Sequence, residues 1–312
     1  MKKKLSLLLA IALICVFSLT GCGDDTLTMA TGGTSGTYYG YCGIIAQNLQ
    51  EDVPVTVVST GASKANLQML QAGEAQLAIV QNDVMSYAYT GTDLFEQDGE
   101  YKDFSTVMAC YPETVQVIAN KKITSIADLK GKKVSVGDAG SGVEFNARQV
   151  LAAYGIDMEK DIVKNNQSFA DSADSLKNGT IDAAFVVAGA PTVAVTELAS
   201  SYDFNVLPID GDAAAKLMKD YGFYTEVVVP GGTYKCVKDD VTTVAVMATI
   251  VARNDVPEDT IYAFVKGMFD KKDQIAAGHE KGQLIDLNTA VSGVTVPFHP
   301  GAEKYFKEQG VL

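Results

Sequence analysis

Short apolar runs alternate with longer amphipathic stretches through most of this 312-residue chain. A short apolar run is typical of a buried strand, and apolar positions that recur every three or four residues are typical of a helix. The alternation predicts parallel strands joined by crossover helices, which is the α/β class. In the first part of the chain we expect strands over 27–30, 55–58 and 77–80, and helices over 38–49 and 63–70.

The same pattern restarts after residue 131. It predicts strands over 133–136, 162–165, 183–187 and 205–209, and helices over 143–154, 169–177, 192–200 and 257–269, with a short last helix from Pro300. Two longer apolar runs, 114–119 and 243–252, lie between these blocks. We expect two βαβ lobes joined by these two crossing segments, with lobe 1 formed by 27–115 and 245–312 and lobe 2 by 116–244. Low-charge crossing segments of this kind suit a hinge.

The chain starts with Lys2, Lys3 and Lys4, followed by apolar residues up to Leu19. A basic start, a short apolar stretch and small residues at its end predict a secretory signal. Fifteen apolar residues fall short of the ~20 that span a bilayer. The end of this segment, Leu19-Thr20-Gly21-Cys22, resembles the bacterial lipobox, in which the thiol receives a diacylglyceryl group and the preceding peptide is removed. We therefore expect a signal peptide over 1–21, a tether over 22–26, and an extracytoplasmic protein anchored to the cell membrane by a lipid on Cys22.

Charge and composition narrow the function classes. Removal of residues 1–21 leaves 291 residues and takes away three lysines and no acid, which lowers the formal charge from −13 to −16. That balance argues against nucleic acid, whose phosphates require a basic surface. With 47% apolar residues, the remainder has the composition of an ordinary globular protein, and we expect a monomer.

Metal sites and catalytic motifs are not evident. Cys42, Cys110 and Cys236 are widely spaced and form no Cys-x-x-Cys or Cys/His pattern, so we expect free cysteines, no metal and no cofactor. The two histidines, His279 and His299, both lie near the end of the chain, and no nucleophile has an obvious base. These observations argue against an enzyme.

Two glycine-rich loops begin the two lobes. Loop 1 (residues 32–37) and loop 2 (residues 137–142) each follow a predicted strand and precede a predicted helix. Glycines leave backbone N–H groups uncovered, and Ser and Thr hydroxyls add donors at the helix start, which makes an anion site. No Gly-Lys-Ser/Thr follows either loop, so we expect a carboxylate rather than a phosphate. If both loops face one cleft, they grip that carboxylate between the lobes.

Acidic side chains near the same strand ends are candidates for an ammonium group. Asp83, Glu113 and Glu144 are the three candidates, because a buried cation needs a paired acid. Taken by itself, each acid is more typical of a helix cap or a rim charge. Arg148 lies one turn after Glu144, and it either pairs with that residue or binds a second ligand carboxylate.

The loop from Ala30 to Tyr39 resembles the TAXI family, the solute receptors of one branch of TRAP transporters. Further segments agree in order over roughly residues 27–312: Thr60-Gly61-Ala62-Ser63, Gln81-Asn82-Asp83, Gly140-Ser141-Gly142 with Glu144 and Arg148, Ala190-Pro191, Pro230-Gly231-Gly232-Thr233-Tyr234, and His299-Pro300-Gly301-Ala302. One departure is Val143, which stands where the family pattern has Thr and removes a hydroxyl donor from the second loop.

The resemblance implies a type II periplasmic-binding-protein-like fold that closes on a small acid and delivers it to a polytopic permease driven by an ion gradient. Family ligands include glutamate, glutamine and dicarboxylates. A receptor of an ABC importer, which shares the fold, is the alternative, and a secreted enzyme is a third. The expected ligand-binding residues are Thr34, Ser35, Thr37, Tyr38, Gln81, Asn82, Glu113, Ser141, Gly142, Val143, Glu144 and Ala190.

Overall fold

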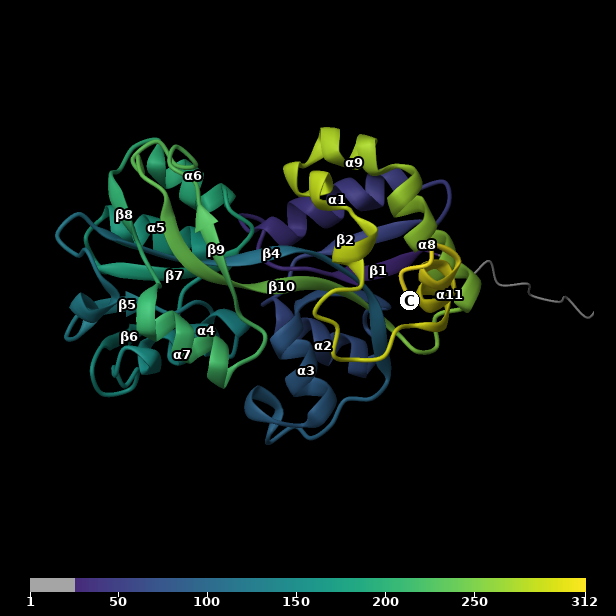
Figure 1. The fold of residues 1–312 in the computed structure, drawn as a ribbon, viewed down its shortest axis with the longest axis horizontal. Helices are drawn as coiled ribbons and strands as arrows, with labels where there is room; N and C mark the ends of the chain where they lie inside the picture. Colours follow the sequence, from purple (N-terminus) through teal and green to yellow (C-terminus); the bar gives the residue numbers. More distant parts are fainter. Residues whose placement is uncertain (1–25) are drawn as a thin grey trace, which may run out of the picture.

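Two long antiparallel strands run through the whole molecule (Figure 1). The computed structural model describes residues 26–312, and in it β4 (Phe104–Asn120) pairs with β10 (Val241–Arg253) where the two lobes join. Both predicted crossing segments are therefore strands. β4 starts at Phe104, well before the prediction, because Pro112 and a nearby register shift interrupt the sequence pattern without ending the strand.

Lobe 1 contains a mixed sheet in the order β2-β1-β3-β10-β4. The first three strands are parallel, and β10 lies antiparallel between β3 and β4. In Figure 1, α1 and α9 lie on one face of this sheet, and α2 and α3 lie on the other. The elements are β1 (Leu27–Ala30), α1 (Thr37–Leu49), β2 (Val55–Val58), α2 (Ser63–Ala72), β3 (Leu77–Gln81), α3 (Asn82–Thr90), α8 (Glu258–Asp270), α9 (Lys272–Gly278), α10 (Leu287–Ala290) and α11 (Pro300–Glu308).

Lobe 2 is built on the other halves of the same two long strands. β7 pairs with β4 and continues the sheet through β5 to β6, while β8 lies on the other side of β4 and β9 pairs with β10. The elements are β5 (Lys133–Ser135), α4 (Gly142–Ala153), β6 (Val163–Asn165), α5 (Phe169–Lys177), β7 (Ala183–Ala188), α6 (Val193–Ala199), β8 (Phe204–Leu207), α7 (Gly211–Asp220) and β9 (Thr225–Val229).

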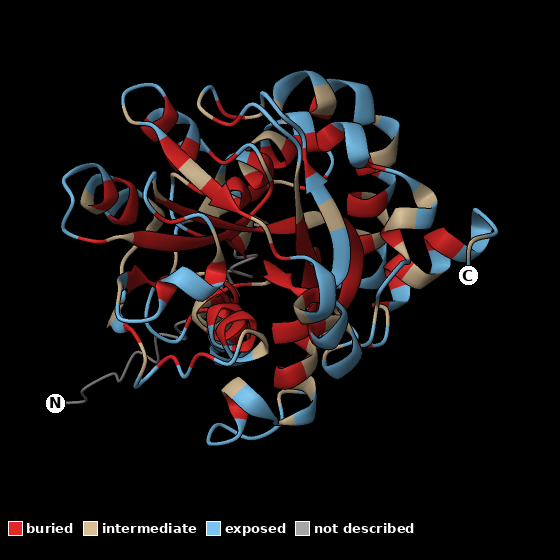
Figure 2. Ribbon diagram, turned by 60° about the vertical axis from the view of Figure 1, so that its left-hand side comes forward, coloured by how far each residue is buried: buried red, intermediate tan, exposed pale blue. Residues whose placement is uncertain are grey.

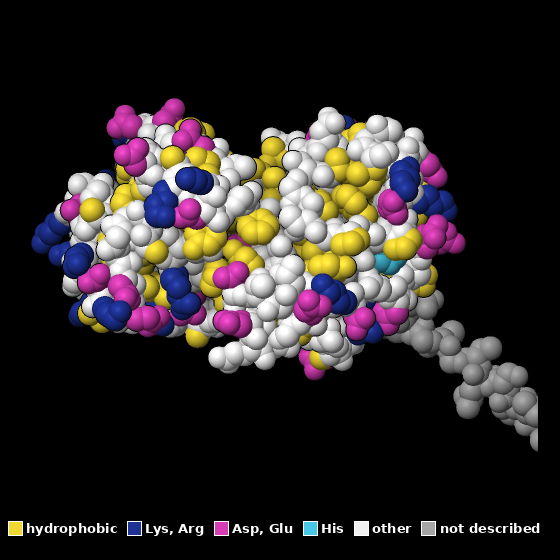
Figure 3. Space-filling model, turned by 60° about the horizontal axis from the view of Figure 1, so that its bottom comes forward, with side chains coloured by type: hydrophobic (Ala, Val, Ile, Leu, Met, Phe, Trp, Pro, Cys, Tyr) yellow, Lys and Arg dark blue, Asp and Glu magenta, His cyan; other side chains and the backbone are white. Residues whose placement is uncertain are grey.

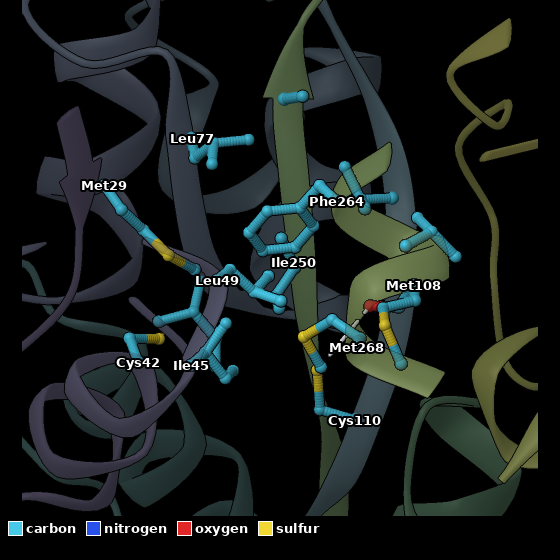
Figure 4. Close-up of a cluster of buried hydrophobic side chains, with 14 of the residues drawn as sticks. Met29, Cys42, Ile45, Leu49, Leu77, Met108, Cys110, Ile250, Phe264 and Met268 are labelled. Atoms are coloured by element: carbon cyan, nitrogen blue, oxygen red, sulfur yellow. Dashed lines mark hydrogen bonds between the residues drawn. The ribbon is translucent and has the colours of Figure 1, made fainter. Parts of the chain in front are cut away.

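Each lobe has its own hydrophobic cores, which enclose the buried strands in Figure 2. In the largest core of lobe 1, Ile45 from α1 and Phe264 from α8 pack on Ile250 of β10 (Figure 4). Cys42 and Cys110 are free thiols buried in this core, as expected, while the free Cys236 is only half-buried in lobe 2. β4 and β10 join the two lobes, and Phe145 of α4 and Phe223 from lobe 2 also pack on Tyr87 of α3 in lobe 1. The predicted lobe boundaries stay a prediction.

Several elements were not predicted. β3 continues directly into α3, so Gln81-Asn82-Asp83 is a strand-to-helix junction rather than the polar end of a strand. α7 and β9 were also missed. Short helices of nine or ten residues are marginal by themselves and gain their stability from packing against the rest of the fold, which the local pattern does not show.

Within residues 26–312, no helix has both the length and the apolar character needed to cross a membrane. The predicted signal peptide and the lipid-bearing Cys22 lie outside the described residues.

Candidate functional site

A cavity lies between the two lobes, where loops follow the carboxyl ends of the strands. This is the edge at which open α/β sheets bind ligands. Of the predicted site residues, Ser35, Thr37, Tyr38, Gln81, Glu113, Ser141, Gly142 and Val143 line the cavity. The structure therefore brings loop 1 and loop 2 together at one site, as expected. That these residues bind a ligand stays a prediction.

Four predicted residues do not line the cavity. Thr34 is exposed on the outside of loop 1. Asn82 is buried, and its Oδ1 accepts a hydrogen bond from the Met247 backbone at 3.0 Å, so it holds β10 against α3. The backbone carbonyl of Ala190 accepts a hydrogen bond from Lys281. The structure thus places Asn82 and Ala190 in supporting contacts and Thr34 on the surface, rather than on the cavity.

Glu144 is the fourth, and its carboxylate is already paired. Its Oε2 accepts a hydrogen bond from the Gly140 backbone at 2.7 Å, and its Oε1 lies 3.2 Å from the Lys164 ammonium. Burial raises the pKa of Glu144, but these hydrogen bonds outweigh it and hold the pKa below its usual value. Arg148 pairs with Glu159 at 3.7 Å instead of with Glu144, and it does not line the cavity.

Three helices of lobe 1 start at the cavity without a side-chain cap: α1, α2 and α3, of which only α3 has an acid, Asp83, in its first turn. The N-cap residues are Gly36 for α1 and Ala62 for α2, and neither first turn contains an acid. The first N–H groups of a helix lack intrahelical partners and carry a partial positive charge. The starts of α1 and α2 therefore favour an anion in the cavity.

The two helices of lobe 2 that start there are capped. Ser141 Oγ accepts a hydrogen bond from the Glu144 backbone in α4, and Ser168 Oγ accepts one from the Asp171 backbone in α5. Each of these first turns also contains an acid. An N-cap side chain satisfies one of the free N–H groups, and an acid offsets the helix dipole. Loop 2 thus resembles loop 1 in sequence but attracts an anion less.

Glu113 is the acidic residue buried at the cavity. It lies on β4, is 2% exposed, and its Oε2 accepts a hydrogen bond from the Tyr38 hydroxyl at 2.7 Å. Burial raises the pKa of Glu113 to about 8, although the Tyr38 hydrogen bond lowers it in part. Burial also raises the pKa of Tyr38 well above its usual value. Tyr38 therefore remains a neutral donor to Glu113.

A buried polar network joins the lobes beside the cavity, and we call it the latch. It connects Asp83 and Tyr87 of α3 with Asn146 and Gln149 of α4 and with Tyr224. Asn146 Nδ2 donates to Asp83 Oδ2 at 2.9 Å and to the Tyr224 hydroxyl at 2.7 Å, and Gln149 Nε2 donates to the Tyr87 hydroxyl at 3.1 Å. Burial raises the pKa of Asp83 to about 6.

Gln81 contacts both the latch and the cavity. Its Nε2 donates to Asn146 Oδ1 at 2.8 Å, and its side chain packs directly on Gly142, where a Cβ atom would lie 1.6 Å from Gln81 Oε1. Only glycine allows this approach between the lobes without a shift. Thr37 adds a further interlobe bond, from its hydroxyl to the Gly189 carbonyl at 3.1 Å.

The cavity wall includes residues outside the expected ligand-binding set. Gly32, Gly33 and Gly36 belong to loop 1 and Asp138 to loop 2, the two loops that were expected at the site. The residues that no site prediction covered are Thr60, Ala62, Ser63, Ser168, Phe169, Val187 and Ala188. Thr60 to Ser63 repeat the signal that identified loops 1 and 2, a strand followed by Gly and Ser and then a helix. Ala62 also has a φ of +68°, a conformation that is uncommon outside glycine and is often found at functional sites.

No histidine, lysine or arginine is among the residues that line the cavity. His299 is buried elsewhere and bonds to the Val256 carbonyl at 3.0 Å, and His279 packs against Tyr41. Among residues 26–312, no group of three or more His, Cys, Asp or Glu side chains has a geometry that would hold a metal ion. Acidic and basic side chains are interspersed over the face shown in Figure 3, without a large basic patch on that face.

Comparisons with solved structures identify the fold. A structure described as a putative L-cystine ABC transporter from Listeria monocytogenes is 17% identical with a TM-score of 0.51, covering 84% of this chain and 97% of that chain. A structure from Bordetella bronchiseptica RB50 is 18% identical with a TM-score of 0.53, covering 92% and 89%. The periplasmic aliphatic sulphonate-binding protein SsuA from Escherichia coli is 16% identical with a TM-score of 0.45, covering 91% and 83%. The predicted periplasmic-binding-protein-like α/β fold is confirmed.

The family whose profile matches this chain is broader than the TAXI family that its sequence segments resemble. The sequence profile of the NMT1-like family matches residues 29–310, which is nearly all of the described chain. The narrower resemblance to TAXI receptors stays a prediction. On this match, the chain belongs to the NMT1-like family.

Proposed function

We propose that this protein is an extracytoplasmic solute-binding receptor that captures a small carboxylate and delivers it to a membrane permease. The observation that carries the proposal is the cavity between two lobes, lined from both and reached by the uncapped starts of α1 and α2. A carboxylate there accepts hydrogen bonds from free N–H groups, and each charge-assisted bond contributes ~1.5–3 kcal/mol. The solute classes are glutamate-like or glutamine-like amino acids and dicarboxylates.

Native mass spectrometry of the purified mature protein, followed by calorimetry with acidic, amidated and apolar amino acids and with dicarboxylates, tests this function. We expect a small carboxylate to copurify or to bind with a stoichiometry of about one per chain. A protein that carries no small acid and binds none contradicts the receptor. Chemical turnover of a bound solute would instead favour a secreted enzyme.

We propose a TRAP-type permease as the partner, on the resemblance to TAXI receptors. An ABC importer is the second candidate, because the Listeria structure with this fold is described as an ABC transporter. The neighbouring genes distinguish the two. A gene for a large polytopic permease supports the TRAP partner, and a gene for an ATPase supports the ABC partner.

The lipid anchor at Cys22 is part of the same proposal. A receptor held near its permease delivers solute over a short distance, and two acyl chains anchor firmly where one is marginal. Cys22→Ser is expected to release the protein from the membrane fraction and to reduce uptake, while solute affinity measured on purified protein stays the same. Retention of the Cys22→Ser protein in washed membranes contradicts the anchor.

A further inference from the structure

Two hydrogen-bond acceptors on the cavity have no partner among the described residues. Gln81 is 3% exposed, and its Oε1 is buried without a hydrogen bond. Glu113 uses Oε2 for the Tyr38 hydroxyl, and no hydrogen bond from residues 26–312 reaches its Oε1. Both residues line the cavity. A buried polar group without a partner costs about 1–3 kcal/mol, so a solute that donates to Gln81 Oε1 recovers that cost.

The latch determines which way the Gln81 amide points. The Asp83 carboxylate accepts from the Val84 backbone at 2.8 Å and from Asn146 Nδ2 at 2.9 Å, so the Asn146 amide nitrogen must face Asp83. Asn146 Oδ1 then faces Gln81 and accepts from its Nε2 at 2.8 Å. The remaining group, Gln81 Oε1, has no hydrogen-bond partner and lies against Gly142, which lines the same cavity. The chain of contacts from Asp83 thus presents an acceptor, and not a donor, to the solute.

The charges around the cavity have one sign. Glu113 is buried at its wall, Asp138 is exposed at its edge, and the lining includes no Lys or Arg. Lys164 and Lys281 are engaged elsewhere, by Glu144 and Glu280 respectively. One carboxylate of a solute finds the uncapped starts of α1 and α2, but a second carboxylate finds no positive partner. A buried charge without a partner is strongly unfavourable.

We infer that the solute carries a protonated amine, which binds the Glu113 carboxylate and donates to Gln81, beside a single carboxylate at the starts of α1 and α2. This inference rests on the proposed function and narrows its solute class to α-amino acids with an uncharged side chain. Phe169, Val143 and Val187 supply apolar walls for that side chain. Because no Lys or Arg lines the cavity, a dicarboxylate is expected to bind more weakly than such an amino acid.

Binding of an amine is linked to the ionisation of Glu113. Burial raises the pKa of this carboxyl to about 8, so the ligand-free protein holds a proton there at neutral pH. A cation requires the ionised form, and binding at pH 7 is expected to release about one proton. Affinity therefore rises with pH, by about tenfold from pH 6 to 7 and by about fivefold from pH 7 to 8.

Matched analogues test the inference on the purified mature protein. Thermal-shift screening of the twenty amino acids, succinate and 2-oxoglutarate identifies the tightest solute, and calorimetry then compares it with analogues that lack one group. Leucine is compared with 4-methylpentanoate and 3-methylbutylamine, and glutamine with 4-carbamoylbutanoate and 4-aminobutanamide. We expect the compound without the amine to bind at least a hundredfold more weakly than the amino acid.

The outcomes separate this inference from the proposed function. Equal binding with and without the amine, preferential binding of a dicarboxylate, or no binding of any amino acid overturns the amine site. Equal binding of the amine that lacks the carboxylate contradicts the carboxylate part of the proposed function and leaves the amine site standing.

A variant and a pH series complete the test. Glu113→Gln keeps the shape and removes the charge, and we expect it to weaken amino-acid binding at least a hundredfold and to abolish the rise of affinity with pH. Glu159→Gln, at an exposed acid away from the cavity, is the control and should bind within twofold of wild type. If Glu113→Gln does not fold, the pH series on the wild-type protein is the test. A solute affinity that is constant or falls between pH 6 and 8 overturns the inference.

Discussion

The two lobes meet the cavity with the same local pattern and with opposite chemistry. Each contributes helices that start at a strand end, but α1 and α2 of lobe 1 are uncapped, whereas Ser141 and Ser168 cap α4 and α5 of lobe 2. Glu113 and Gln81 also approach from the lobe 1 side, while lobe 2 adds Val143, Phe169 and Val187. On the proposed function, we expect lobe 1 to recognise the charged groups of the solute and lobe 2 to cover it.

The largest effect is expected when loop 1 is given the chemistry of loop 2. Gly36→Asp places an acid at the N-cap of α1. Its carboxylate accepts hydrogen bonds from the free N–H groups of the first turn and repels the carboxylate of the solute. A Cβ at Gly36 meets only the Gly33 carbonyl at 3.3 Å and Phe169 at 3.6 Å, so the side chain fits with a small shift. We expect solute affinity to fall about a hundredfold by calorimetry.

Gly36→Asn is the matched control, because it has the shape of Asp without the charge. It is expected to weaken binding about tenfold or less, since it competes for the same N–H groups but does not repel the solute. Equal losses for Asp and Asn would mean that the start of α1 does not hold an anion.

Closing the lobes on the solute is expected to depend on Gly142. In Gly142→Ala the new Cβ would lie 1.6 Å from Gln81 Oε1 and 2.9 Å from a Val84 methyl, so the lobes must separate or Gln81 must move. We expect about a tenfold loss of affinity and a larger radius of gyration in small-angle scattering with solute present. Gly222→Ala, with nothing within 4 Å of its Cβ, is the control. Unchanged scattering and affinity for Gly142→Ala would contradict the contact.

The buried Glu113 carboxyl should make the free energy of unfolding of the ligand-free protein depend on pH. The pKa of Glu113 is raised to about 8, so the folded protein binds more protons than the unfolded chain up to that pH, and stability falls as pH rises. Between pH 6.5 and 8, above the raised pKa of about 6 at Asp83, we expect a loss of about 2 kcal/mol in urea unfolding of the ligand-free protein.

Glu113→Gln is expected to remove this loss and to be more stable than wild type at pH 8. That result would make Glu113 a residue kept for binding at a cost in stability. A wild-type protein whose stability stays constant or rises over this range would contradict the burial of an ionisable Glu113.

The smallest effect on solute affinity is expected in lobe 2. Ser141→Gly removes the hydroxyl that loop 2 turns to the cavity and costs only a few tenths of a kcal/mol as an N-cap change, whereas Ser141→Ala costs about 1 kcal/mol. We expect either variant to weaken solute binding only a few-fold, because lobe 1 carries the charged contacts. A hundredfold loss of solute affinity in Ser141→Gly would mean that loop 2 contributes as much to binding as loop 1.

Most of the elements were predictable because their apolar spacing is local. The strands at 27–30 and 55–58 and the helix at 169–177 have the predicted bounds, since the strands are short runs rich in apolar residues and the helix has one buried face. α3, α7 and β9 were not predictable, because their stability comes from contacts distant in sequence. Pro112 concealed the first half of β4 for a similar reason: in the structure β10 pairs with it from a position far along the chain.

The candidate site was predictable as a place but not in its chemistry. Two Gly/Ser loops after strands indicated an anion site between lobes, and the cavity lies there. Sequence alone left Asp83, Glu113 and Glu144 as equal partners for an amine. The structure distinguishes them. Glu144 forms an ion pair with Lys164, and Asp83 accepts a hydrogen bond from Asn146. Glu113 lines the cavity and uses only its Oε2 for the bond from Tyr38.

The sequence by itself determined the α/β class, the two crossing segments and the location of the glycine loops, because periodicity and glycine content act on neighbouring residues. Only the tertiary structure decided which polar groups are already satisfied. Whether a carboxylate or an amide is free depends on partners such as Lys164, Asn146 and Tyr38, which the fold brings from other elements. The free acceptors that remain, on Glu113 and Gln81, carry the inference about the solute.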